Sequence, residues 1–350
     1  MERAERTGWR KTRRVCRPWA GPAGIAVLLL VGLGLLLAGA AEAQSHGKRG
    51  VREECDGWLP DLRCGRSGRF EGFQRPIVQP FLFEDPFVTT GIYPHYVYHE
   101  FPGRSALQGG EIHVVAVQAR LALTDRIGLI ATKDGYAWRR PDNPLLDDIQ
   151  GFFNLAAGVK VALLGDAESG YLVSGILRIE APTGASDTFQ GEGDGMALPS
   201  LAAAWDLGPV NLIGDLGAQI PFDQGEQSTS VFYHLYADLE LHSRFQPFVQ
   251  LSGITWVSSG DGSLSIDLAG GGSLPLDVVQ DALGTGPFEG ADVLNLGSAQ
   301  VDNLDLWTAA LGAHVPLTDR VVLSAAYERT ISHHKGIFQQ RVTTALQFEF

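Results

Sequence analysis

The chain ends in VTTALQFEF, residues 342–350, in which side chains alternate between two faces. One face carries Val342, Thr344, Leu346, Phe348 and Phe350, and the other is small or polar. A period of two is that of a β-strand with one apolar and one polar face. An edge strand of a soluble sheet can alternate in the same way, so the rest of the chain must decide what this strand belongs to.

The same alternation recurs upstream, for example in 155–163, 171–179 and 231–241. In each stretch one face is apolar, whereas the other includes charged residues such as Lys160 and Asp238. Charges on that face would be costly in lipid or in a dry core. An aqueous lumen enclosed by an apolar outer wall accounts for both faces.

The connections alternate in length along the chain. Short turns are expected at 123–126, 165–170, 206–209, 242–244 and 317–320, and longer polar segments at about 102–110, 135–152, 182–197, 221–230, 258–300 and 332–337. Strands joined in this way close into a barrel with short periplasmic turns and long outer loops. The predicted fold class is all-β: a transmembrane antiparallel up-and-down β-barrel of about 12 strands over residues 87–350, with both ends on the periplasmic side.

The amino terminus has the features of a signal peptide at residues 1–43. A basic stretch is followed by an apolar run at 24–38 and by Ala41-Glu42-Ala43, which favours cleavage before Gln44. An uncleaved anchor is the alternative. After this segment no apolar run reaches the roughly eighteen residues of a transmembrane helix. A leader, a strand pattern and a final aromatic residue together predict the bacterial outer membrane, with outer-membrane lipid and the barrel-assembly machinery as partners, the latter through the strand ending at Phe350.

Composition supports a folded protein and excludes one class of partner. Of the 350 residues, 45% are apolar and 19% are charged, and the formal net charge is −13. Without residues 1–43 that charge becomes roughly −17. No basic face for nucleic acid is expected.

Residues 44–86 lack the strand pattern and are rich in Phe and Pro toward their end. We expect an irregular amino-terminal segment, either periplasmic or plug-like in the lumen, with the periplasm favoured. Cys55 and Cys64 are the only thiols after the leader, and their spacing in an oxidising compartment suits a local disulfide. No Cys or His cluster suggests a metal site.

The inward face of the strands provides the candidate functional residues. The predicted lumen-lining residues are Arg120, Lys160, Arg178, Glu180, Asp215, His234, Tyr236, Asp238, Gln250 and Glu328. Both charge signs are present, so no strong ion selectivity is expected from them. Phe232, Tyr236, Phe248 and Trp256 share the inward register and would allow an aromatic or apolar solute to pass, or would pack a narrow lumen shut.

Two further features concern the barrel ends. Aromatic residues near strand ends predict two interfacial girdles: Trp205, Phe245, Phe348 and Phe350 on the short-turn side, and Phe153, Tyr233, Trp307 and Tyr327 on the long-loop side. The segment 258–300 contains apolar patches at 274–276 and 278–279. It could fold inward as a constriction, cap the mouth, or form an exposed loop.

Two stretches carry a resemblance to a known family. Residues 178–184, RIEAPTG, precede a polar glycine-rich loop and then LPSLAAAWDLG at 198–208. Together they resemble outer-membrane proteins of the phenol-degradation (meta-pathway) transporter family, over about residues 150–350. The resemblance implies a barrel that admits hydrophobic compounds.

The expected function is a passive channel for small solutes, hydrophobic or aromatic ones among them, without catalytic residues, metal or cofactor. The first alternative is an outer-membrane barrel enzyme such as a lipid hydrolase, for which His333 and His334 would be the candidates. The second is a structural or adhesive barrel that acts through its outer loops. No motif in the sequence supports a catalytic set.

Overall fold

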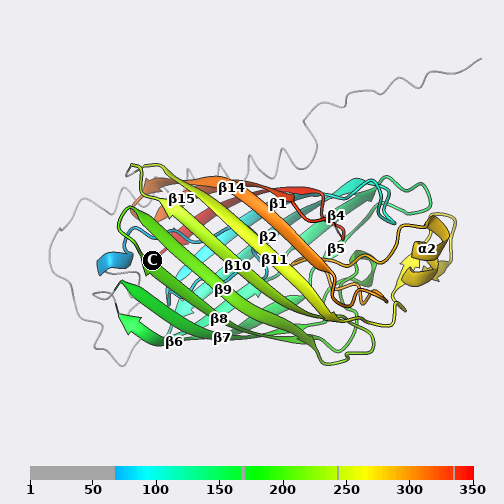
Figure 1. The fold of residues 1–350 in the computed structure, drawn as a ribbon, viewed down its shortest axis with the longest axis horizontal. Helices are drawn as coiled ribbons and strands as arrows, with labels where there is room; N and C mark the ends of the chain where they lie inside the picture. The colour runs from blue at the N-terminus through cyan, green and yellow to red at the C-terminus, as the bar shows by residue number, and fades with distance from the viewer. Residues whose placement is uncertain (1–67, 167–169, 243, 334–335) are drawn as a thin grey trace, which may run out of the picture.

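The fold is a closed β-barrel, seen from the side in Figure 1. A computed structural model describes residues 68–350 apart from 167–169, 243 and 334–335. The predicted leader and the Cys55–Cys64 pair lie outside the described residues. Among the described residues, no helix has the length and apolar character needed to cross a membrane.

The strands and helices of the described chain are as follows. The barrel is built from β1 (Gly91–Glu100), β2 (Gly110–Ala122), β3 (Ile127–Lys133), β4 (Tyr136–Pro141), β5 (Ile149–Phe152), β6 (Leu155–Asp166), β7 (Tyr171–Ala181), β8 (Met196–Asp206), β9 (Val210–Pro221), β10 (Thr229–Leu239), β11 (Gln246–Ser258), β14 (Asp305–Thr318), β15 (Val321–Thr330) and β16 (Gln340–Glu349). The remaining elements are the 3-10 helices η1 (Gly68–Phe70) and η2 (Ser186–Thr188), the strands β12 (Ser265–Asp267) and β13 (Ser273–Pro275), and the helix α2 (Leu276–Leu283).

The ring contains twelve strand positions, all antiparallel. β1 pairs with both β16 and β2, which closes the sheet. β3 and β4 pair with successive parts of β2 and act as one interrupted strand. β5 and β6 pair with β4 and β3 and act as the next interrupted strand. The predicted fold class is therefore confirmed, because closure leaves no unpaired sheet edge in the bilayer.

The prediction of one long loop at 135–152 is wrong in part. It contains β4 and β5, which pair with each other and extend the barrel wall beyond the ends of its neighbours. The interruption before β4 lies at Gly135, where φ is +123° and an added Cβ would lie 2.7 Å from the carbonyl oxygen of Val115. Glycine suits such a conformation far better than any other residue.

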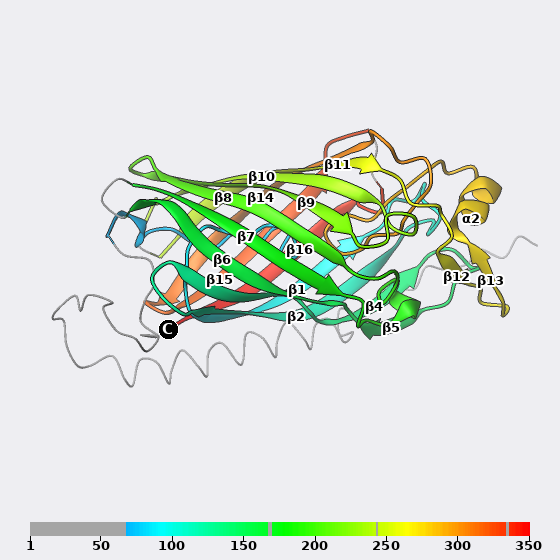
Figure 2. The same ribbon diagram turned by 90° about the horizontal axis from the view of Figure 1, so that it is seen from below.

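The long connections gather at the end of the barrel opposite Phe350. Figure 2 shows β12, β13 and α2 beyond that end, where they project from the loop between β11 and β14. The strands that flank the five predicted short turns meet at the other end, although residues 167–169 and 243 of two turns lie outside the described residues. Short turns mark the periplasmic side of such barrels, so the strand that starts at Gly91 and the strand that ends at Glu349 both have their termini there.

The outward face of the wall is apolar and exposed, as a lipid-facing surface must be. Leu177 and Leu235 are each 53% exposed and Leu311 is 65% exposed, whereas the residues on either side of Leu177 and of Leu235, which face inward, are buried. Water-soluble proteins do not usually display so extended an apolar surface. The belt therefore identifies the wall as membrane-spanning.

The aromatic girdles are found in part. Trp205 and Phe245 are exposed near the short turns, and on the long-loop side the rings of Tyr233 and Trp307 lie 4.8 Å apart. Phe153 is an error in the prediction: it is 2% exposed and packs inside the mouth against Phe81. The break between β5 and β6 turns Phe153 inward, and the sequence pattern does not reveal that break.

The exposed belt can be tested with one substitution. Leu235→Arg places a charge near the middle of β10, so we expect it to destabilise the folded barrel by about 2–4 kcal/mol. Urea unfolding in phospholipid vesicles measures this change. Leu207→Arg, in the exposed turn between β8 and β9, is the matched control and should cost no more than about 1 kcal/mol. Equal effects at both positions would show that the barrel is not embedded as described.

Candidate functional site

The barrel interior is occupied by residues 68–90, here called the plug. The plug enters at the periplasmic end, where Arg69 Nε lies 2.5 Å from Asp206 Oδ2. It reaches Phe81 at the level of the mouth, and it returns to Thr90, whose carbonyl oxygen accepts a hydrogen bond from the Phe350 N–H. Residues 73–86 therefore lie in the lumen, as the plug-like alternative predicts, and not in the periplasm, which the sequence favoured. Residues 44–67 lie outside the described residues.

The centre of the lumen holds a cluster of buried charges. Glu84 of the plug accepts hydrogen bonds from Arg120 Nε on β2 at 3.0 Å and from Lys160 Nζ on β6 at 2.7 Å. Lys160 Nζ also lies 3.2 Å from Asp85 Oδ1, and Arg75 of the plug lies 2.9 Å from Asp85 Oδ2. All five side chains are at most 4% exposed. Isolated charges at such depth would be very unfavourable, so the wall cations and the plug carboxylates depend on each other.

Other polar side chains of the wall bind the plug backbone. Arg178 on β7 donates to the carbonyl oxygens of Phe81 and Leu82 at 3.1 and 2.8 Å. Gln250 on β11 donates to the Val78 carbonyl oxygen at 3.2 Å. Since the plug has no strand partner for these groups, the wall side chains satisfy them instead.

Strands β9, β10 and β15 of the wall contact the plug through their side chains. The ring of His234 stacks on Phe83 with centroids 4.8 Å apart, and its Nδ1 lies 2.5 Å from Asp215 Oδ1. Gln79 of the plug donates to Glu328 Oε1 on β15 at 2.6 Å. Nearer the periplasm, Phe rings from both ends of the plug form a cluster that packs against the inward face of the wall.

The remaining predicted residues lie inward but bind wall partners. Glu180 accepts from Lys133 Nζ at 2.6 Å, and Asp238 accepts from the Tyr236 hydroxyl at 3.0 Å. Thus all ten predicted lumen residues point into the barrel, and none is more than 5% exposed. The structure places seven of them against the plug: Arg120, Lys160, Arg178, Asp215, His234, Gln250 and Glu328. Their role in solute passage stays a prediction.

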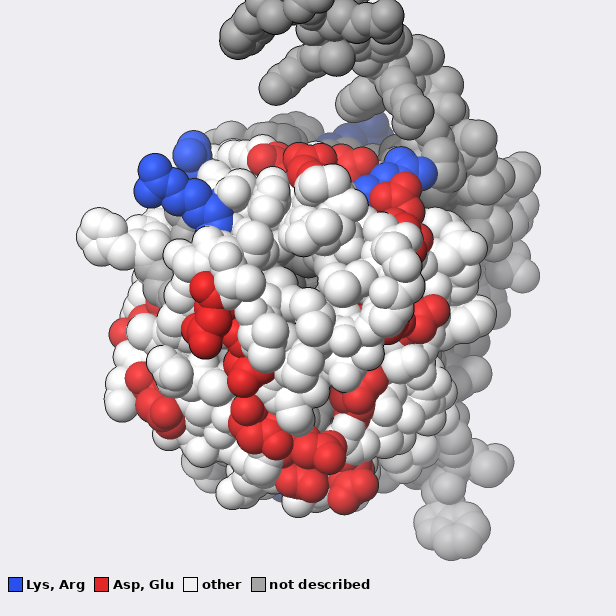
Figure 3. Space-filling view, turned by 90° about the vertical axis from the view of Figure 1, so that its right-hand side faces the viewer, with Lys and Arg blue, Asp and Glu red and all other residues white. Residues whose placement is uncertain are grey.

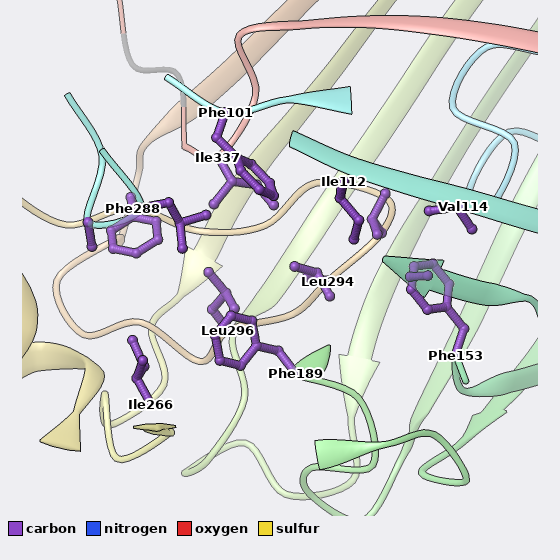
Figure 4. Close-up of a cluster of buried hydrophobic side chains, with 14 of the residues drawn as sticks. Phe101, Ile112, Val114, Phe153, Phe189, Ile266, Phe288, Leu294, Leu296 and Ile337 are labelled. Carbon is purple, nitrogen blue, oxygen red and sulfur yellow. The ribbon is translucent and has the colours of Figure 1, made fainter. Parts of the chain in front are cut away.

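The mouth is occupied by a second inserted segment, residues 286–301, here called the mouth loop. Figure 4 shows Phe288, Leu294 and Leu296 of this loop directed toward side chains from the surrounding wall and loops, among them Ile112 and Ile337. The segment 258–300 thus combines two of the predicted alternatives, since its last part folds inward while β12, β13 and α2 stay outside.

A buried ion pair fixes the mouth loop to the wall. Arg341 on β16 donates to both carboxylate oxygens of Asp292, at 2.6 and 3.0 Å. His99 Nδ1 lies 3.1 Å from Arg341 Nη2 on its other side. Bidentate Arg–carboxylate pairs are among the stronger polar contacts in proteins. The mouth loop is therefore held by the same kind of contact as the plug.

The two ends of the barrel differ. Figure 3 shows side chains over most of the mouth, with Asp and Glu spread across its face and Lys and Arg near its edge. At the periplasmic end a cavity of about 1000 Å³ is lined by Glu71 and Gln74 of the plug and by turn residues such as Arg244 and Arg320. Water thus reaches the plug from the periplasm.

The sequence pattern did not indicate the carboxylates of the inserted segments. Glu84 and Asp85 lie in Phe83-Glu84-Asp85-Pro86-Phe87, where acidic residues are flanked by large apolar ones. This composition could have indicated buried charges that need partners. Asp292 has no comparable signal in its Gly-rich surroundings. Within residues 68–350, gaps aside, no group of three or more His, Cys, Asp or Glu side chains is placed to hold a metal ion.

Solved structures similar to this chain are barrels of the outer membrane. An outer membrane channel from Pseudomonas putida F1 is 16% identical, with 77% of this chain and 98% of that chain covered and a TM-score of 0.48. The NanC porin is 7% identical, with 75% and 100% covered and a TM-score of 0.43. The β domain of the Bordetella autotransporter BrkA is 13% identical, with 75% and 100% covered and a TM-score of 0.41.

No family model and no curated protein matches the chain. The resemblance to phenol-degradation transporters therefore stays a prediction. The closed ring, the exposed apolar belt and the short periplasmic turns define the class: an outer-membrane β-barrel protein. Within that class, this chain is a twelve-strand barrel with a plug and an inserted mouth loop.

The charged centre predicts how firmly the plug is held. Lys160→Met leaves Glu84 and Asp85 with one fewer cation, and breaking a buried pair costs about 3–5 kcal/mol. We expect the free energy of local opening of residues 76–89 to fall by about that amount in hydrogen exchange monitored by mass spectrometry.

Lys133→Met provides the matched control. Lys133 is also buried and paired, but its partner Glu180 belongs to the wall. Plug exchange should therefore stay as in the unaltered protein. Faster plug exchange in the Lys133 variant than in the Lys160 variant would contradict the assignment of the central cluster as the anchor of the plug.

Proposed function

We propose that the protein is an outer-membrane channel for small solutes, and that it is closed in this structure by the plug and the mouth loop. Passage requires both segments to move away from the wall. Solutes then pass down their concentration gradient through a polar lumen. No chemistry is assigned to the barrel.

The observation that carries this proposal is the polar and charged interior of the wall. Arg120, Lys160 and Arg178 lie on strands that span the membrane, and their partners come from a segment outside the sheet. A barrel that served only as a scaffold could fill its interior with apolar side chains and avoid the cost of burying charges. A wall built for water and solute needs these groups once the plug leaves.

Aromatic residues support solutes with an apolar part. Phe232 and Tyr236 on β10, with Phe248 and Trp256 on β11, are buried in the lumen. In the ring of twelve, β10 lies opposite β2, which carries Arg120. A solute between these walls would meet cations on one side and aromatic faces on the other. Small aromatic solutes fit this division.

The proposal is tested by releasing both inserted segments in the full-length chain. The released variant is Glu84→Gln with Asp85→Asn and Asp292→Asn, which keeps every wall residue. Removing these charges takes from Arg120 and Lys160 their anionic partners in the plug, and from Arg341 its partner Asp292, and so weakens the closed form. In planar lipid bilayers we expect the released variant to show stepwise conductance with an open time about tenfold longer than that of the unaltered protein.

The control removes three exposed carboxylates that also lie outside the strands of the wall, through Glu71→Gln, Glu226→Gln and Asp281→Asn. It should behave as the unaltered protein does. Hydrogen exchange of the plug shows whether the released variant has let it go. Fast plug exchange without any conductance would overturn the channel proposal.

A further inference from the structure

The two inserted segments share a charge pattern that the wall complements. Among the residues described in the structure, the buried cations of the wall strands are Arg120, Lys133, Arg139, Lys160, Arg178 and Arg341. The buried carboxyl groups of the wall are four: Glu180, Asp215, Asp238 and Glu328. The plug and the mouth loop contribute one buried arginine, Arg75, and four carboxyl groups, Glu84, Asp85, Glu289 and Asp292. The wall thus has an excess of cations, and the inserted segments have an excess of acids.

The contacts follow the same division. Glu84 and Asp85 contact Lys160, and Asp292 forms its bidentate pair with Arg341. Glu289 differs, because it accepts hydrogen bonds from the Ser228 hydroxyl and from backbone N–H groups of its own loop. Two segments far apart in sequence therefore present carboxylates to cations of the wall.

The carboxyl groups of the wall are largely engaged within the wall. Glu180 pairs with Lys133, Asp215 with His234, and Asp238 with Asn211 on the neighbouring strand at 2.8 Å. These contacts do not involve the inserted segments and can persist after the segments leave. Lys160, in contrast, loses both carboxylates that contact it, and Arg341 loses its bidentate partner Asp292 and keeps only Glu328, whose Oε2 lies 3.8 Å from Arg341 Nη1.

Arg139 and Arg178 add unsatisfied donors to this surface. Arg139 is 4% exposed, and its Nε and Nη1 have no hydrogen-bond partner among the described residues, while its guanidinium lies 4.2 Å over the ring of Phe189. Arg178 Nε is likewise buried without a partner in the described part of the chain. Buried donors of this kind favour an incoming acceptor.

We infer that the lumen wall is an anion-binding surface, and that the solutes it passes are small carboxylic acid anions, whose carboxylates take the places of Glu84, Asp85 and Asp292. This inference rests on the proposed channel function and names its substrate class. The aromatic side chains of β10 and β11 would accommodate the apolar body of an aromatic acid. From the sequence, inward-facing charges of both signs suggested no ion selectivity. In the structure, most of the buried cations belong to the wall, and the inserted segments carry an excess of carboxylates.

The acidic residues at the mouth oppose this preference only weakly. They are exposed to solvent, and at 0.15 M salt charges more than about 8 Å apart are largely screened. Lys160 and Arg341 are at most 1% exposed inside the barrel, where screening is weaker. These buried cations therefore set the selectivity.

The experiment measures reversal potentials of the released variant in a potassium chloride gradient. We expect chloride to be favoured over potassium by about tenfold, because uncompensated lumen cations attract anions at short range. Adding Lys160→Gln and Arg341→Gln should bring the ratio close to one. Adding Arg126→Gln, which removes an exposed cation in a periplasmic turn, should leave the ratio unchanged.

Replacing chloride by benzoate on one side tests the substrate class, and benzoate should carry current at least as readily as chloride. Preference for potassium, or a chloride preference that the two wall substitutions leave intact, would overturn the inference while the channel proposal stands. Exclusion of benzoate from a chloride-selective channel would overturn the choice of carboxylates.

Absence of conductance from the released variant would overturn the channel function, and this inference with it. Folding of each variant is checked by its heat-dependent migration in detergent gels. Where the wall variants fail to fold, the sign of the reversal potential of the released variant decides the question alone.

Discussion

The pairing of wall cations with carboxylates from outside the sheet is the interaction on which the rest of the structure depends. Lys160 is 1% exposed and lies within 3.2 Å of both Glu84 and Asp85. Without these carboxylates the charge would need water or another anion around it. The plug therefore completes the interior of the barrel, and the barrel keeps the plug folded although the plug has no regular structure beyond η1.

This dependence links stability to function. A segment held by apolar packing alone would be hard to replace, because no solute could offset the loss of that burial. The plug and the mouth loop also pack apolar side chains against the wall, but their ion pairs and the hydrogen bonds to their carbonyl groups can be replaced by those of water and of a solute that offers equivalent groups. The mouth loop repeats the arrangement with Asp292 and Arg341. In both segments that close the lumen, a carboxylate therefore pairs with a cation of the wall.

The fold could be predicted because the alternation of apolar and polar side chains along a strand is a local property of the sequence. Alternation along residues such as 231–239 places every side chain on one face or the other, and turns at 123–126 and 317–320 mark where strands reverse. The inward direction of Lys160 and Asp238 followed from the same register. Where the register breaks, at Gly135 and at Phe153, the prediction failed, because such breaks depend on how strands fit around a closed ring.

The sequence predicted one part of the candidate site, the residues of the wall, but not the residues of the inserted segments. Its wall residues lie in periodic strands, whereas Glu84, Asp85 and Asp292 lie in segments without periodicity, and their positions are set by the tertiary contacts of the finished barrel. Phe81 and Leu82, which accept hydrogen bonds from Arg178, gave no sign that they lie within a barrel. A pattern of two residues can place a side chain on a wall, but it cannot say what fills the space between walls.

The most direct measurement is the rate at which a single thiol in the plug reacts in native outer membranes. In a chain whose three cysteines are replaced by serine, Val78→Cys places this thiol at a position that is 1% exposed, on a segment whose backbone binds Gln250. We predict slow labelling by a small water-soluble maleimide, and fast labelling once Glu84→Gln and Asp85→Asn are added. Fast labelling with both carboxylates present would show that the plug does not occupy the lumen.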